Sequence, residues 1–302
     1  MQIIKLNYLH LLLTGALIWL WFVFNQQPNA HHHEWAKLLL QLAVLVWVPV
    51  AFQLLGYAER TALPVALGGY GLVAAMLLPP GTLAGSLACG WLLICLWVFK
   101  KGVDYLLSET RDAGRWALGA AQLFLIIGAL WAIADRFGWQ PLGFDRAIVL
   151  LTGVNFHYAG FLFPLLTGWL YQQAPSRTNQ LAAQLAIVAV PLTAVGITIS
   201  QLTGNFIPEA FAATTVAVSG WLCGWGYFRL SSGGNIPLPV RLLWTVTGLS
   251  LFFSMTLALG YAMRPFYPMD WMQIPFMRAW HGTVNALGVG GCGVLGWRVF
   301  RK

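Results

Sequence analysis

Long hydrophobic runs separated by short polar stretches dominate this sequence. Ten runs are bounded by charged residues, proline or glycine, at residues 6–24, 35–57, 62–78, 83–99, 115–134, 147–171, 182–203, 209–230, 240–262 and 276–298. A helix of about 20 apolar residues crosses a hydrocarbon core of about 30 Å. The pattern therefore predicts an all-α fold, a polytopic membrane helix bundle of about ten transmembrane helices in a single integral membrane domain over residues 1–302.

The composition agrees with that interpretation. Of the 302 residues, 59% are hydrophobic and 9% are charged, whereas soluble domains carry about 25% charged residues. This balance excludes an ordinary soluble domain, which has too little interior to bury so much apolar surface. The cysteines lie inside hydrophobic runs without a CxxC pair, so we expect neither a disulfide nor a zinc ribbon. They are Cys89, Cys95, Cys223 and Cys292.

The positively charged residues divide unevenly between the two sides of the predicted bundle. Twelve of the 17 fall on the side of the N-terminus, namely Lys5, Arg60, Lys100, Lys101, Arg111, Arg115, Arg177, Arg229, Arg241, Arg298, Arg301 and Lys302. The other five are Lys37, Arg136, Arg146, Arg264 and Arg278. Because cytoplasmic loops collect Lys and Arg, we expect a cell-membrane protein with both termini in the cytoplasm. The bases are scattered over short loops, so we expect membrane lipids and no nucleic acid as partners.

The first five predicted helices (residues 1–134) and the second five (residues 135–302) share short similarities. The run QLAVLVWVP at residues 41–49 resembles QLAIVAVP at residues 184–191. Five helices per half would place the halves in opposite orientations, as in the inverted repeats of many transporters. Short apolar matches also arise by chance, so a 5+5 inverted repeat and a chance similarity both stay open.

Polar side chains inside a bilayer are costly unless they are paired or used, and the second five helices hold the clearest examples. In the sixth run, Asn155, His157 and Tyr158 lie about ten residues past the outer boundary, which is about 15 Å into the membrane at 1.5 Å per residue. In the tenth run, His281 lies nearer the outer end, and Asn285 follows one turn below on the same face. We expect these groups to share one pocket in the outer half of the bilayer.

Such a pocket suits acid and base chemistry. Imidazole is the side chain whose unperturbed pKa lies near 6.5, so His157 and His281 are candidate catalytic residues, with Glu209 at the start of the eighth run as their partner. Asn155 and Asn285 are candidates to orient an imidazole nitrogen or a substrate oxygen. The alternative is structural, with each histidine bonded to a carbonyl or hydroxyl group of a neighbouring helix.

A metal or haem site is a further alternative. Two histidines and one glutamate from three helices form a small ligand set, and their spacing matches no zinc pattern. We therefore assign no metal ligands and leave the cofactor open. The run His31, His32 and His33 falls in a predicted outer loop, where adventitious metal binding is the simpler interpretation.

Two segments carry a family resemblance. QPLGFDRAIVLLTGVNFHYAGFLFPLLTG at residues 140–168 and WHGTVNALG at residues 280–288 resemble the YndJ-like membrane protein family, which is marked by an HFHYAGF segment and a later HGxxNA segment. The matching positions are His157, Tyr158, Gly160, His281, Gly282 and Asn285. This chain has Asn155 where the family usually has its first histidine, so the resemblance implies no pair of histidine ligands in that helix. A transporter is one role that the resemblance implies.

Two functions are compatible with these residues. The first is an intramembrane enzyme that performs acid/base chemistry of the isomerisation or cyclisation type on a lipid or isoprenoid-like substrate. The second is a small-molecule transporter with alternating access between inverted halves, and a metal or haem carrier is a third. The first two require a small hydrophobic or amphipathic ligand. In the enzyme, His157, His281 and Glu209 would be catalytic, and the substrate-binding residues would be Asn155, Tyr158, Asn285, Gly160 and Gly282.

Overall fold

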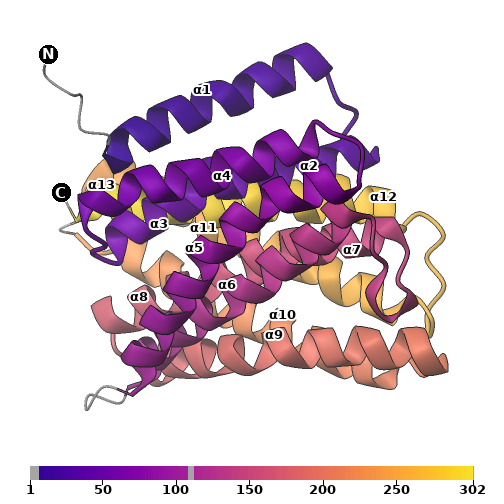
Figure 1. Cartoon of the computed structure of the whole chain (residues 1–302). Coiled ribbons are helices and arrows are strands. Elements are labelled where there is room, and N and C mark those ends of the chain that lie inside the picture. Colours follow the sequence, from indigo (N-terminus) through magenta and orange to yellow (C-terminus); the bar gives the residue numbers. More distant parts are fainter. Residues whose placement is uncertain (1–6, 108–111, 235, 302) are drawn as a thin grey trace, which may run out of the picture. The chain divides into compact units, whose positions relative to one another are not determined.

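The computed structural model describes residues 7–107, 112–234 and 236–301, and helices account for most of them (Figure 1). No strand occurs in this part of the chain, which confirms the all-α fold. Three of the bases that predict the orientation in the membrane, Lys5, Arg111 and Lys302, lie outside the described residues.

Ten helical segments follow one another along the described residues, one for each predicted hydrophobic run. The first five are α1 (Tyr8–Gln26), α2 (His33–Leu42) with α3 (Val48–Leu54), α4 (Ala62–Met76), α5 (Thr82–Leu106) and α6 (Ala113–Phe137). The second five are α7 (Arg146–Asn155) with α8 (Phe163–Gln173), α9 (Arg177–Thr203), α10 (Ile207–Ser231), α11 (Leu238–Met263) and α12 (Ile274–Met277) with α13 (Gly293–Phe300). Two short 3₁₀ turns lie in the connecting loops, at Glu59–Thr61 and Pro141–Gly143.

Three of these segments join two α-helical pieces through π-helical turns. The π-helical segments are Ala43–Trp47 between α2 and α3, Phe156–Leu162 between α7 and α8, and Arg278–Gly282 with Val284–Cys292 between α12 and α13. π-helix is rare, and it occurs mostly as short bulges that are frequent at functional sites. Hydropathy does not reveal these segments, because a π-turn leaves the hydrophobic run unbroken.

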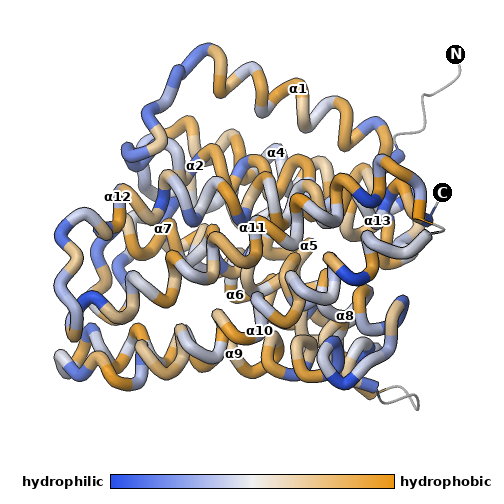
Figure 2. Tube along the Cα trace, turned by 180° about the vertical axis from the view of Figure 1, so that it is seen from behind, coloured by the Kyte–Doolittle hydropathy of each residue, from blue (hydrophilic) through white to orange (hydrophobic). Residues whose placement is uncertain are grey.

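Seven segments in the described part of the chain are long and apolar enough to cross a membrane. They are α1, residues 33–54, α5, α6, residues 146–173, α9 and α11. In Figure 2 the tube of α1 is orange (hydrophobic) over most of its length and turns blue (hydrophilic) in the loop that follows it. The chain is therefore a multi-pass membrane protein. Because α4 has only 15 residues, fewer than the roughly 20 that cross a bilayer, the count of ten crossings and the cytoplasmic placement of both termini stay predictions.

The chain divides into two compact units. The first contains residues 1–103 and 122–162, and the second contains residues 104–121 and 163–302. The expected boundary between two halves, after residue 134, lies inside the first unit. The inverted repeat therefore stays a prediction.

The centre of the first unit is the segment that runs from α2 into α3. Every residue from Leu38 to Phe52 is buried, as expected for a helix that is hydrophobic on all sides and packs against neighbours all round. α1 crosses this segment closely at Gly15, where an added Cβ atom would collide with the carbonyl oxygen of Leu45. Trp19 Nε1 strengthens the crossing by donating a hydrogen bond of 2.8 Å to the carbonyl oxygen of Leu38.

In the second unit, α9 packs along α10, α10 packs along α11, and the final helix (residues 274–300) packs on α11. Gly224 of α10 and Gly248 of α11 allow a close approach, since an added Cβ atom on either would lie 3.0 or 2.9 Å from the carbonyl oxygen of the other. Trp297 Nε1 donates to the Tyr227 hydroxyl over 2.7 Å, and that hydroxyl donates to the carbonyl oxygen of Leu166 over 3.0 Å. These two bonds join α8, α10 and the final helix.

Candidate functional site

The residues that the sequence singles out gather at the π-helical segments. Asn155 is the last residue of α7, and the segment that follows contains His157, Tyr158 and Gly160. In the final helix, His281 and Gly282 lie in the first π-helical segment and Asn285 lies in the second. A π-turn widens the helix and rotates the side chains that follow it. Both family motifs therefore lie where the helix departs from regular α geometry.

His157 is fully buried, with 0% of the residue exposed, and both of its ring nitrogens are bonded. Trp91 Nε1 of α5 donates to His157 Nε2 over 3.0 Å, and His157 Nδ1 lies 2.7 Å from the carbonyl oxygen of Gly153. Because an indole N–H is only a donor, Nε2 is the acceptor, and the proton of the neutral ring is on Nδ1 and faces Gly153. His157 therefore has one fixed tautomer and no free nitrogen for a substrate.

A glycine on α6 makes room for this imidazole. An added Cβ atom on Gly128 would lie 2.8 Å from His157 Nδ1. The rings of Trp91 and His157 lie nearly parallel, with an interplanar angle of 21° and their centroids 6.1 Å apart. These contacts favour the structural alternative for His157.

The other motif residues of this helix divide between the interior and the surface of the protein. The Tyr158 hydroxyl donates to the carbonyl oxygen of Leu39 on α2 over 2.8 Å. Gly160 is buried, and an added Cβ atom on it would lie 3.4 Å from the Cβ atom of Phe124. Asn155 is exposed. Since both His157 nitrogens are bonded to other groups, Asn155 does not orient that imidazole, and its role in substrate binding stays a prediction.

His281 belongs to a closed hydrogen-bond network between α11 and the final helix. His281 Nδ1 lies 2.8 Å from the carbonyl oxygen of Ser254, and Asn285 Nδ2 lies 3.0 Å from His281 Nε2. The Ser254 hydroxyl completes the network by donating to Asn285 Oδ1 over 3.0 Å. With Nδ1 facing a carbonyl oxygen, the neutral ring donates through Nδ1 and accepts the amide N–H of Asn285 at Nε2.

The exposure of His281 distinguishes it from His157. His281, Gly282 and Asn285 are each partly exposed, whereas Ser254 is fully buried. A close helix contact supports the network, because an added Cβ atom on Gly288 would collide with the Ser250 hydroxyl oxygen. His281 is thus oriented by its partners and is also reachable, and a residue that transfers protons needs both properties.

Glu209 lies in the first turn of α10 and accepts a hydrogen bond of 2.5 Å from the Ser200 hydroxyl of α9. The two helices approach closely here, since an added Cβ atom on Gly196 would lie 3.0 Å from the Cα atom of Glu209. No hydrogen bond in the described part of the chain joins Glu209 to His281. The expected partnership of Glu209 with a histidine stays a prediction.

The candidate residues fall in both compact units. His157 and Tyr158 belong to the first unit, and His281, Asn285 and Glu209 belong to the second. The single pocket that the sequence predicts for both histidines therefore stays a prediction.

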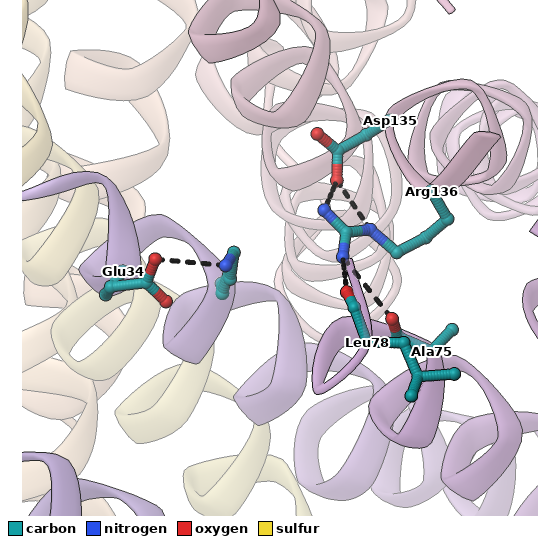
Figure 3. A network of polar contacts seen from close by, with 6 residues as sticks. Glu34, Ala75, Leu78, Asp135 and Arg136 are labelled. Carbon is teal, nitrogen blue, oxygen red and sulfur yellow. Dashed lines mark hydrogen bonds and ion pairs between the residues drawn. The ribbon is translucent and has the colours of Figure 1, made fainter. Parts of the chain in front are cut away.

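The sequence pattern does not predict the buried ion pair near the end of α6 (Figure 3). Asp135 and Arg136 are 2% and 1% exposed, and Arg136 Nε donates to Asp135 Oδ2 over 2.8 Å. Arg136 Nη1 also donates to the carbonyl oxygens of Ala75 and Leu78, at 3.3 and 3.4 Å. Because the last carbonyl groups of a helix lack partners in the helix, Arg136 caps the end of α4. In the sequence, adjacent opposite charges at the end of a hydrophobic run look like ordinary loop residues.

The histidine run at residues 31–33 leads into the first turn of α2. The next residue, Glu34, pairs with Lys37 over 3.0 Å at the surface (Figure 3). Among residues 7–107, 112–234 and 236–301, no group of three or more His, Cys, Asp or Glu side chains is arranged to hold a metal ion.

Comparison with known proteins identifies the family. The model of the family described as YndJ-like protein matches residues 38–289, which are 252 of the 302 residues and include both histidine motifs. A relative, the membrane protein YndJ of Bacillus subtilis (strain 168), is 28% identical over 179 residues. The alignment covers 59% of this chain and 31% of the relative, so this chain matches about a third of the relative's length. No solved structure matches the chain. Since the family model covers most of the sequence, the chain belongs to the YndJ-like family.

Proposed function

We propose that this protein is an intramembrane enzyme that performs acid/base chemistry on a lipid or isoprenoid-like substrate, with His281 as the residue that exchanges a proton. The observation that carries the proposal is the network in which Ser254 and Asn285 hold the His281 imidazole in one orientation, at a residue that is partly exposed. His157 is also held in one orientation, but it is fully buried and its Nε2 accepts from the buried indole of Trp91. In this proposal His157 has a structural role.

The bonds around His281 indicate how a proton would move. The Nδ1 proton faces the Ser254 carbonyl oxygen, which leaves Nε2 as the basic nitrogen, covered by the Asn285 amide. When a substrate displaces that amide, Nε2 removes a proton from one carbon atom, and the imidazolium returns a proton to another. An isomerisation by this route gains and loses one proton and consumes no oxidant or reductant. The displaced Asn285 amide is then available to bind a substrate oxygen.

The place of the network supports one class of substrate. It joins α11 to the final helix within hydrophobic sequence, and a polar group among membrane helices meets molecules that partition into the bilayer. Gly282 follows His281 in the chain and is also partly exposed. A hydrophobic or amphipathic substrate fits this environment.

Deuterium incorporation tests the proposal. The purified protein in lipid nanodiscs is incubated in D₂O with a total membrane lipid extract that contains isoprenoids, and mass spectrometry follows carbon-bound deuterium in each lipid class. We expect incorporation into one class and a rate about 10²- to 10⁴-fold lower in His281→Gln, the range typical of general acid–base catalysis. The loop variant His31→Gln is the matched control and should keep the wild-type rate. Absence of incorporation in the wild type, or an unchanged rate in His281→Gln, would contradict the proposal.

The division into two compact units favours a second candidate, a small-molecule transporter. Many transporters work by movement of one part against another, and the chain passes from the first unit to the second where the π-helical segment before α8 ends. Uptake of a fluorescent amphipathic compound into proteoliposomes, without deuterium incorporation in any lipid, would replace the enzyme with the transporter. If uptake is unchanged in His281→Gln, transport does not depend on the His281 network.

A further inference from the structure

We propose that the second unit carries a binding site for an anionic phospholipid, at the end where its basic residues gather. The loop between α8 and α9 and the loop between α10 and α11 meet there around a cavity of about 410 Å³. The distribution of Lys and Arg predicts that this end faces the cytoplasm. None of the residues that line the cavity belongs to the His281 network, so this site is independent of the proposed enzyme.

The lining of the cavity has one cation and no carboxylate. The cation is Arg229 of α10, which is exposed and forms no ion pair in the described part of the chain. A guanidinium group donates two parallel hydrogen bonds to a phosphate and holds its charge at any physiological pH. An arginine without a carboxylate partner at the edge of a cavity is therefore suited to bind a phosphate group.

Polar groups of the two loops add to the attraction. Ser176 caps the start of α9, and Thr178 and the Gly233–Gly234 turn contribute to the wall of the cavity. The first N–H groups of a long helix have no partner within the helix and favour negative charge nearby. They reinforce the preference for an anion that Arg229 establishes.

An apolar groove beside the cavity distinguishes a lipid from a free phosphate. This groove, of about 560 Å³, is lined by Phe228 and Ser232 of the α10 end and Phe252 of α11, and it shares Trp225 and Arg229 with the cavity. Trp225 is 52% exposed, and exposed tryptophans of membrane proteins concentrate at the level of the lipid headgroups. A phosphate beside Arg229 and an acyl chain against the aromatic rings together match a phospholipid.

Further bases near the cavity favour a net negative headgroup. Arg177 is the first residue of α9, and Arg241 in the first turn of α11 donates through Nε to the carbonyl oxygen of Ser231 over 2.9 Å. Basic pockets between membrane helices on the cytoplasmic side bind anionic headgroups. We therefore expect phosphatidylglycerol to bind in preference to the zwitterionic phosphatidylcholine.

Thermal unfolding in nanodiscs tests the site. A lipid that binds only the native state raises the melting temperature, so we expect a higher value in phosphatidylcholine discs that contain phosphatidylglycerol than in phosphatidylcholine alone. Arg229→Gln should remove more than half of this rise, and Arg229→Lys, which keeps the charge, should retain most of it. Arg60→Gln changes an exposed base of the first unit on the same predicted side, and it should keep the whole rise.

Three results would overturn the proposal. The first is a rise in melting temperature that is as large in Arg229→Gln as in the wild type. The second is a wild type with equal melting temperatures in the two lipid compositions. The third is an equal rise when inorganic phosphate is added to phosphatidylcholine discs, which would assign the cavity to free phosphate. Arg229→Gln should match the wild type in phosphatidylcholine alone, because the side chain is exposed. If the melting temperature of Arg229→Gln differs from that of the wild type in phosphatidylcholine alone, Trp225→Leu is used in place of Arg229→Gln. This variant removes the aromatic side chain shared by the cavity and the groove and leaves Arg229 in place. The proposal then requires a smaller rise in Trp225→Leu and fails if the rise is unchanged.

Discussion

The two histidine networks bond the imidazole in the same way at Nδ1 and differ in the group that donates to Nε2. In both, Nδ1 faces a backbone carbonyl oxygen, that of Gly153 for His157 and that of Ser254 for His281. Nε2 of His157 accepts from Trp91, an indole that is 1% exposed and belongs to another helix. Nε2 of His281 accepts from the side chain of Asn285, a partly exposed residue one turn further along the same helix.

This difference shows why a histidine among membrane helices is not by itself evidence of chemistry. An indole packed in the core cannot move aside without opening the core and leaving two polar groups without partners, each at a cost of about 1–3 kcal/mol. The Asn285 side chain also holds two hydrogen bonds, to His281 Nε2 and from the Ser254 hydroxyl, but it belongs to a partly exposed residue, where a substrate or water can replace the bonds that its rotation breaks. The group bonded to the imidazole thus separates a structural histidine from one that can react.

The largest expected effect is the difference in the free energy of unfolding between variants that lack one or the other imidazole. We expect His157→Ala to lower the free energy of unfolding by about 3–5 kcal/mol, because it leaves a cavity and an unsatisfied indole N–H. His281→Ala should lower it by about 1 kcal/mol, since the network is partly exposed. Denaturant unfolding of both variants in the same mixed micelles measures the contrast, with His31→Ala as the control for loss of an exposed imidazole. Equal losses would remove the distinction between the two networks.

A smaller effect tests how tightly the first network is packed. Gly128→Ala places a Cβ atom 2.8 Å from His157 Nδ1 and 3.1 Å from the Cβ atom of Phe156, and overpacking of this kind costs about 1–3 kcal/mol. Gly81→Ala is the matched control, because nothing lies within 4 Å of its added Cβ atom. The same unfolding measurement should show a loss for Gly128→Ala alone. If both variants unfold like the wild type, the His157 ring has more freedom than its contacts indicate.

Hydropathy predicted the helices because a chain in lipid has to satisfy its backbone groups within helices, and each of the ten runs coincides with one helical segment. Helix ends were predicted less well. The fourth run ends at residue 99, before two lysines, but α5 continues to Leu106. Charged residues end the part of a helix that lies in lipid, and they do not end the helix itself.

The candidate residues were predictable only where a residue type is rare in its surroundings. His157 and His281 stand out because few ionisable residues interrupt the hydrophobic runs. Trp91 is one of 16 tryptophans and lies 66 residues from His157 along the chain, and Gly128 is one of 32 glycines. Only the packing of helices shows which tryptophan or glycine meets the imidazole. Ser254 could not be identified for the same reason, since hydroxyl residues occur throughout these helices.

The smallest expected effect comes from removing the Ser254 hydroxyl while the His281 imidazole stays in place. Ser254→Ala removes the hydrogen bond to Asn285 Oδ1 but keeps the backbone carbonyl oxygen that orients His281 Nδ1. We expect a loss of about 0.6 kcal/mol in the free energy of unfolding, typical of one hydrogen bond between membrane helices, and a deuterium incorporation rate within about tenfold of the wild type, because one such bond corresponds to less than a factor of ten. Denaturant unfolding and deuterium incorporation measure the two quantities, with Ser86→Ala of α5 as the exposed serine control. A loss of rate as large as that of His281→Gln would mean that the hydroxyl itself transfers a proton, and Asn285 would then link two reacting groups instead of covering one.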